Sequence, residues 1–168
     1  GSKLTPLGAG TQKIEEEAAQ LFPEARIARL DSDTSQNKTF EKQTVKAFAN
    51  GDIDILIGTQ IVTKGFDFKN LRMVVVISAD SLLGVQDFRA DEKALQLLEQ
   101  FRGRCGRRSD RGLFIIQTSQ PEHPVYQNLM TNNGQNFNRK LLEERKDFNF
   151  PPYSRIIEIT IRDKNEKR

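Results

Sequence analysis

The chain has 168 residues, of which 36% are hydrophobic and 29% charged, a composition typical of a soluble domain that is long enough to bury a core. The mean hydropathy is −0.60, and the longest apolar run, residues 73–77, is far too short to cross a bilayer, so a membrane role is not expected. The single cysteine, Cys105, excludes an internal disulfide and a cysteine-based zinc site, and it favours a reducing cytoplasm. The net charge of +3 is only mildly basic, so nucleic-acid binding has to be argued from the positions of the arginines.

Helix and strand patterns alternate along the first 118 residues. Pro23 ends the first helix pattern, and the pair Asn50-Gly51 is typical of the end of the second helix. Two later apolar runs are nearly continuous, as expected of strands that are buried on both faces. The sequence therefore predicts helices at residues 11–22, 38–49 and 90–101, and strands at residues 26–30, 53–58, 72–78 and 113–118.

This alternation predicts an α/β fold with a mainly parallel sheet and helices on both faces. Sheets of this kind bind ligands beyond the carboxyl ends of their strands. That rule selects the loops after Gly58, after Ser78 and beside the arginines that follow residue 101.

The character of the chain changes beyond Pro121. His123 stands between two prolines, where we expect a turn or the start of a helix and no chemistry. We expect a polar break at residues 131–138 and a charged helix at residues 140–148. The prolines at 151 and 152 then precede an alternating strand at residues 156–162, which we expect to begin a further unit or to pair at a sheet edge.

The run QFRGRCGRR, from Gln100 to Arg108, is the most distinctive stretch of the sequence. It places a glycine directly before Arg104 and another directly before Arg107. The planar guanidinium group grips phosphate oxygens with two parallel hydrogen bonds, and glycine lets the backbone approach a ligand closely. The run therefore indicates phosphate recognition, with a solvated basic loop as the alternative.

A second polar loop follows the strand at residues 53–58. Thr59 and Gln60 come directly after this strand, and Gly65 and Asp67 follow them. A hydroxyl group and backbone amides at the end of a strand suit a phosphate or a sugar-phosphate, and a carboxylate can hold a ribose hydroxyl or a metal-bound water. The alternative is an ordinary turn in which Gly65 supplies the bend and Asp67 caps a backbone amide.

The chain contains no GxxxxGK[ST] phosphate loop, so it lacks the lysine and hydroxyl pair that holds nucleotide phosphates with magnesium. An arginine cluster without such a loop suggests that this segment supplies an arginine finger to a nucleotide bound elsewhere. Asp91 and Glu92 resemble a metal-binding pair. They lie in the first turn of a predicted helix, however, where the helix dipole favours acidic residues, and we interpret them in that way. Cys105 is interpreted as a small filler.

At this point the residues resemble a known family. The stretch GTQIVTKGFDF is similar to the fifth motif, and QFRGRCGRR to the sixth motif, of superfamily 2 helicases, whose second RecA-like lobe ends in QxxGRxGR. Longer stretches, including ISADSLLGVQDFRADEKALQLLEQ and FNFPPYSRI, resemble the primosomal replication-restart helicases of bacteria. The resemblance runs from Gly8 to about Ile161. Arg102 and Cys105 stand where that family often has small residues, and no target is assigned to Arg102.

The resemblance implies a role for each matching residue. Arg107, as the finger, and Arg104 would reach the γ-phosphate of ATP held by a first lobe, and Gln100 would steady the same network. The residues on the nucleotide side of the cleft would be Gly65, Asp67, Gly103 and Gly106. The DNA backbone would be contacted by Thr59, Gln60 and Lys64.

The resemblance also implies a division of the chain and a set of partners. Residues 1–122 would form most of a second RecA-like lobe, residues 123–150 a helical extension, and residues 151–168 the start of a C-terminal domain or an edge strand. ATP and Mg²⁺ would be bound mainly by the first lobe, and zinc by an insertion elsewhere in the full-length protein, with no metal site in this segment.

The function implied is ATP-dependent unwinding of forked DNA during replication restart, in the bacterial cytoplasm at the nucleoid. Other primosome proteins and single-strand-binding protein would be partners, and this segment alone would be inactive. Two alternatives stay open: another superfamily 2 translocase or RNA helicase, and a non-catalytic module that binds phosphate or nucleic acid.

Overall fold

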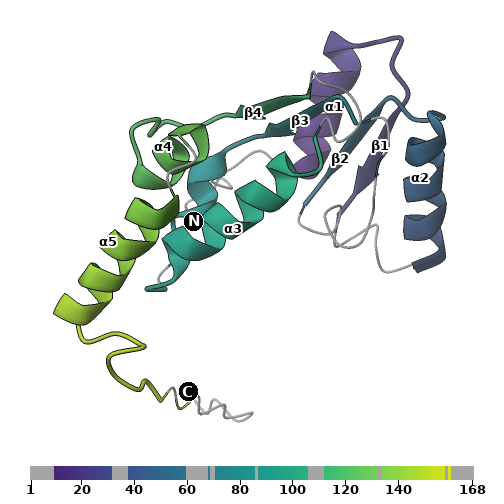
Figure 1. Ribbon diagram of the computed structural model, residues 1–168. Helices are drawn as coiled ribbons and strands as arrows, with labels where there is room; N and C mark the ends of the chain where they lie inside the picture. The colour runs from purple at the N-terminus through teal and green to yellow at the C-terminus, as the bar shows by residue number, and fades with distance from the viewer. Residues whose placement is uncertain are drawn as a thin grey trace, which may run out of the picture.

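The structure is a computed structural model that describes residues 10–31, 38–59, 68, 71–85, 87–105, 112–131, 134–157 and 159. Up to β4 its main helices and strands alternate as predicted, and their bounds differ from the predicted ones by at most two residues at each end (Figure 1). In chain order they are α1 (Thr11–Leu21), β1 (Ile27–Leu30), α2 (Lys38–Asn50), β2 (Ile55–Gly58), β3 (Met73–Val76), the short 3₁₀ helix η2 (Ala79–Leu82), α3 (Ala90–Arg102), β4 (Leu113–Ile116), α4 (Pro124–Thr131) and α5 (Gly134–Asp147).

The strands form two parallel pairs, which confirms the predicted parallel pairing. In the first pair, β1 lies beside β2, with Leu30 opposite Gly58. In the second pair, β3 lies beside β4, with Val76 opposite Ile116. A parallel pair requires a crossover between its strands, and α2 and α3 supply these two crossovers.

Helices cover both faces of the β1–β2 pair. Leu30 and Leu56 share one face and pack with Val45 of α2 and with Phe48. Arg29 points to the other face, where its Nε donates a hydrogen bond to Glu15 of α1 at 2.9 Å. Figure 1 shows α1 and α2 flanking this pair, as expected of a parallel sheet.

Among the described residues, helices cover only one face of the β3–β4 pair. Val76, Phe114 and Ile116 pack on the cluster that α3 and α4 form. The alternate residues of both strands are half-exposed, with 51% exposure at Met73 and 40% at Ile115. The second pair therefore presents an apolar outer face.

Helix α2 ends in the way that the sequence predicts. Gly51 has a φ of +85°, a left-handed conformation that glycine adopts without a steric penalty. Its N–H donates to the carbonyl of Phe48, and the N–H of Asp52 donates to the carbonyl of Ala47 at 2.9 Å. These two bonds form a Schellman motif, which satisfies carbonyl groups of the last turn.

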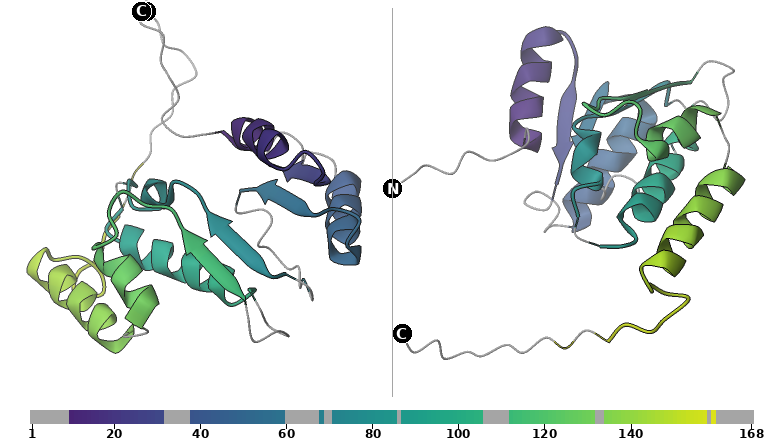
Figure 2. Two further views of the ribbon diagram at one scale, coloured as in Figure 1. Left: turned by 90° about the horizontal axis from the view of Figure 1, so that it is seen from above. Right: turned by 90° about the vertical axis from the view of Figure 1, so that its left-hand side faces the viewer.

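The main core lies between α3, α4 and α5. Leu98 of α3 and Val125 of α4 are completely buried, and Phe137 of α5 joins the same cluster. The helical segment predicted at residues 123–150 thus shares its core with α3. Figures 1 and 2 show α5 at the opposite end of the molecule from α2.

Two predictions for the C-terminal part differ from the structure. The polar break predicted at residues 131–138 is shorter, since α4 extends to Thr131 and α5 begins at Gly134, before the predicted start at residue 140. Burial of Phe137 against the core explains this earlier start. The predicted strand at residues 156–162 is not formed at residues 156, 157 and 159, whose isoleucines are exposed and have no neighbouring strand, and the rest of it lies outside the described residues.

Asp80 of η2 holds together the carboxyl ends of β3 and β4 and the start of α4. Its carboxylate accepts hydrogen bonds from the hydroxyl of Thr118, from the N–H and hydroxyl of Ser119, and from the Tyr126 hydroxyl at 3.2 Å. These bonds, above all that from Thr118, lower the pKa of Asp80 to about 2. Burial in turn raises the pKa of Tyr126.

We expect Asp80→Asn to lower the thermal unfolding midpoint at pH 7. An amide has only one oxygen acceptor, so part of the Asp80 network is lost. Because the folded pKa lies below the unfolded value, the stabilisation is present above the unfolded pKa of about 3.9 and disappears as the pH falls through about 2. Thermal unfolding of wild type and variant between pH 7 and pH 2 should therefore show a difference that shrinks at acid pH. The exposed Asp147, changed to Asn, is the control, and a difference independent of pH would contradict the prediction.

Candidate functional site at the end of helix α3

Helix α3 carries the chain to the arginine run. Ala94, Leu95 and Leu98 are buried on one face of this helix and fix it against the core. Asp91 and Glu92 lie in its first turn, as predicted, where the helix dipole favours acidic side chains. The helix ends at Arg102, so the arginine run, residues 100–108, begins in its last turn.

The residues after α3 form a turn that continues its hydrogen bonding. The Gly103 N–H donates to the carbonyl of Glu99 at 2.8 Å, and the Arg104 N–H donates to the carbonyl of Phe101 at 3.1 Å. The Cys105 N–H then donates to the carbonyl of Arg102 at 3.1 Å. Arg104 is therefore held by the backbone of a turn and does not lie in an extended loop.

Cys105 fixes the far side of this turn. Its thiol lies 3.2 Å from the carbonyl oxygen of Leu113, the first residue of β4, and 3.5 Å from that of Arg72, which precedes β3. The half-buried sulfur thus contacts both strands at their amino ends. The sequence predicts that Cys105 is a small residue that fills space, and the structure shows that its thiol also contacts two backbone carbonyl groups.

Arg102 has a structural partner that the sequence did not indicate. Its Nη1 donates to the carbonyl oxygen of Leu129 at 2.6 Å, in the last turn of α4. The last four carbonyls of a helix lack partners within the helix and carry the negative end of its dipole, so a guanidinium group is a favourable donor there. A basic residue in the last turn of α3 is a signal for such an interaction, but it does not reveal which helix supplies the carbonyl.

Gln100 and Thr59 are exposed. Gln100 lies one helical turn before Arg104 on α3, and its side chain makes no hydrogen bond with the described part of the chain. Thr59 directly follows β2 and Asp31 directly follows β1, after the last paired residues, Gly58 and Leu30. The carboxylate of Asp31 is buried and accepts a hydrogen bond from the Thr11 hydroxyl at 2.6 Å. Thr59 is thus the exposed polar residue at the carboxyl edge of this strand pair.

The remaining predicted site residues lie outside the described residues. Of the predicted nucleotide and finger positions, the structure describes Gln100, Gly103 and Arg104, and it joins them at one helix end. Of the predicted DNA contacts, it describes Thr59. The positions outside the described ranges are Gln60, Lys64, Gly65, Asp67, Gly106 and Arg107.

The rule that ligands bind at carboxyl ends of strands does not select the arginine run. Cys105 places this run at the amino ends of β3 and β4. The carboxyl end, after Ser78, is instead closed by the Asp80 network. The carboxylate of Asp80 is thus occupied by the protein's own donors, and the expectation that the loop after Ser78 lies at the ligand crevice stays a prediction.

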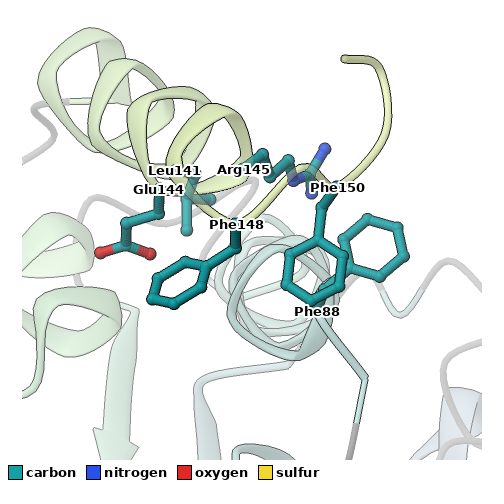
Figure 3. Close-up of a pocket in the computed structure, with 6 residues that line it drawn as sticks. All are labelled: Phe88, Leu141, Glu144, Arg145, Phe148 and Phe150. Atoms are coloured by element: carbon teal, nitrogen blue, oxygen red, sulfur yellow. The ribbon is translucent and has the colours of Figure 1, made fainter. Parts of the chain in front are cut away.

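A small hollow of about 140 Å³ lies elsewhere, where α5 meets the start of α3 (Figure 3). The rings of Phe88 and Phe150 stack with centroids 5.0 Å apart, and Arg145 lies over Phe88 while it binds Glu92 of α3. Phe148 closes one side of the hollow. None of the predicted site residues lines it.

Among the described residues, no cluster of three or more His, Cys, Asp or Glu side chains could hold a metal ion. In the same part of the chain, no helix combines the length and the apolar character that a membrane span needs.

Comparison with known proteins gives a consistent set of matches. Residues 8–109, which include the arginine run, match the family described as "Helicase conserved C-terminal domain". The chain is 41% identical over 160 residues to the replication restart protein PriA of Synechocystis sp., with 95% of this chain and 19% of the relative covered. It is 41% identical to the protein of that name from Bacillus subtilis, with 92% and 19% covered, and 42% identical to that from Treponema pallidum, with 96% and 24% covered. The chain thus spans about a fifth to a quarter of the length of these curated relatives.

We expect Gly103→Ala to leave the free energy of unfolding within about 0.5 kcal/mol of wild type. Gly103 has a φ of −66°, which any residue adopts, and an added Cβ would lie 3.2 Å from the carbonyl oxygen of Glu99, so the turn has to shift by only a few tenths of an ångström. Gly51→Ala is the contrast, because its φ of +85° should make the alanine costly. Chemical denaturation measures both variants, and an equal loss of stability would contradict the prediction.

Proposed function

Because the chain belongs to the helicase conserved C-terminal domain family, we propose that it is the second motor lobe of an ATP-dependent DNA helicase that acts in replication restart. The observation that carries the proposal is the family match across the arginine run, together with about 40% identity to proteins named for replication restart. The chain has the α/β fold of a RecA-like second lobe, with parallel strands and packed helices.

The proposed role of the arginine run is to act on ATP held by a separate first lobe. Arg104 and Arg107 would reach the γ-phosphate, with Arg107 as the finger, and Gln100 would orient this pair. The turn after α3 supports this role, because its backbone hydrogen bonds fix Arg104 about one turn beyond the exposed residue Gln100. Bound ATP supplies the phosphoryl group that is transferred to water. Fixed guanidinium groups lower the barrier by meeting the negative charge of that step.

Glycine before Arg104 suits such a site. The backbone conformation of Gly103 does not require glycine, since its φ is −66°. An added Cβ would lie 3.2 Å from the carbonyl oxygen of Glu99, and the absence of a side chain also lets a ligand or the other lobe approach this turn closely. We infer the same role for Gly106, and we assign Gly65 and Asp67 to the nucleotide side of the cleft.

The proposed DNA contacts are Thr59, Gln60 and Lys64. The exposure of Thr59 at the end of β2 leaves its hydroxyl accessible to a phosphate oxygen. The proposal extends to forked DNA, to other primosome proteins and to single-strand-binding protein as partners, in the cytoplasm at the nucleoid. Mg²⁺ would be bound with ATP by the first lobe, and zinc by an insertion outside this segment.

The proposed division of the chain places the lobe at residues 1–122 and a helical extension at residues 123–150. The buried contacts of Val125 and Leu129 with α3 indicate that the extension is an integral support of the lobe. Residues 151–168 would lead into a further domain.

In the full-length protein, we expect Arg107→Ala to lower DNA-stimulated ATP turnover by about 10³-fold or more, with nucleotide affinity unchanged. The reason is that the finger contacts charge that develops only during phosphoryl transfer. Steady-state ATPase and nucleotide-binding assays measure the two effects. Arg139→Ala is the control, since Arg139 is exposed on α5 and its ion pair with Glu143 is of the weak surface kind. Near-wild-type turnover of Arg107→Ala would refute the finger assignment.

We expect Lys64→Ala to weaken single-stranded DNA binding and to reduce the slope of log affinity against log salt by about 0.7. Loss of one phosphate contact removes one released counterion and leaves sequence preference unchanged. Titrations at several salt concentrations measure the slope, with Lys140→Ala on the exposed face of α5 as the control. An unchanged slope would remove Lys64 from the DNA site.

A further inference from the structure

The turn after α3 is anchored on both sides of Arg104. On one side, Arg102 binds the carbonyl of Leu129 in α4. On the other side, the Cys105 thiol contacts the carbonyl of Leu113 at the start of β4. Arg104 lies between these anchors, two residues from the first and one residue from the second. The position of its backbone is therefore set by α4 and by β4 together.

We propose that Arg102 is a positioning residue for Arg104, through its bond to helix α4. This inference rests on the proposed function of the arginine run. It also assigns a target to Arg102, which occupies a variable position of the QxxGRxGR pattern.

The chemistry of the contact favours arginine at this position. Leu129 is buried in the core, so its carbonyl is a fixed acceptor, and it belongs to the last four residues of α4. The guanidinium group of Arg102 lies near the negative ends of two helices, its own α3 and the neighbouring α4. A guanidinium group is permanently protonated and carries several N–H donors, so it can interact favourably with the carbonyl ends of both helices.

The bond between Arg102 and Leu129 affects the arginine run because the turn is hydrogen-bonded to the end of α3. Successive backbone bonds from Gly103, Arg104 and Cys105 return to the last turn of α3. A movement of the α3 end away from α4 would therefore move Arg104 with it. Misplacement of a catalytic group by about 1 Å can lower a rate by about 10²-fold.

Arg145 offers a matched control at the other end of α3. It is also a half-buried arginine that ties α3 to a later helix, through its bond from Nη2 to Glu92 in the first turn. Both arginines tie α3 to a later helix, but only Arg102 belongs to the arginine run and lies two residues before Arg104. A purely structural role predicts similar effects of the two truncations on catalysis, whereas a positioning role predicts different effects.

The experiment uses the full-length protein and measures DNA-stimulated ATPase activity, with kcat and KM for ATP, DNA affinity and thermal midpoint. We expect Arg102→Ala to lower kcat by about tenfold, with KM and DNA affinity within about twofold of wild type. Arg145→Ala should lower the thermal midpoint and keep the wild-type kcat. In the Arg104→Ala background, adding Arg102→Ala should cause little further loss, since Arg102 acts through Arg104.

Several results would overturn the inference. These are an unchanged kcat for Arg102→Ala, an equal fall in kcat for Arg145→Ala, and full additivity with Arg104→Ala. A raised KM for ATP or weaker DNA binding would show that Arg102 contacts a ligand directly. If Arg102→Ala does not fold, Arg102→Gln replaces it, with a smaller fall in kcat expected and a wild-type kcat contradicting the inference.

The Arg107→Ala variant separates this inference from the proposed function. If Arg107→Ala loses turnover while Arg102→Ala keeps it, the finger assignment stands and the positioning role fails. If Arg107→Ala keeps turnover, the proposed function of the arginine run fails and the positioning role fails with it.

Discussion

The structure depends on the burial of one face of helix α3. Leu98 is completely buried, and the same face contacts β3 and β4 below it and α4 beside it. Burial of apolar surface is the dominant favourable term in folding, and it fixes the rotation of a helix about its axis. With that rotation set, Arg102 meets α4 and the chain leaves the helix at the amino end of β4. Among the described residues of the candidate site, the position of Arg104 therefore depends on the packing of α3 in the core.

Much of this arrangement could be predicted from the sequence, because it depends on local patterns. Apolar periodicity located the helices, continuous apolar runs located the strands, and the Asn50-Gly51 pair located the end of α2. The QxxGRxGR spacing selected the candidate site because its arginines and glycines are close in sequence. The family match covers the same segment.

Contacts between distant residues could not be predicted in this way. The acceptor for Arg102 lies 27 positions further along the chain, and Asp80 collects its donors from 38 to 46 positions away. Such pairs depend on how helices rotate and cross, which a single sequence does not specify. The rule on carboxyl ends of strands likewise did not indicate that Asp80, after Ser78, binds the protein's own groups. The expected strand at residues 156–162 needed a partner strand, which local alternation cannot supply.

The apolar outer face of the β3–β4 pair bears on how this lobe could be handled in isolation. Met73 lies opposite Leu113 and Val75 opposite Ile115, so four neighbouring side chains form one contiguous half-exposed surface. Surfaces of this kind promote aggregation of isolated domains. An engineered soluble version of the lobe would accordingly carry polar side chains at these outward positions, and the inward positions that support α3 would be left unchanged.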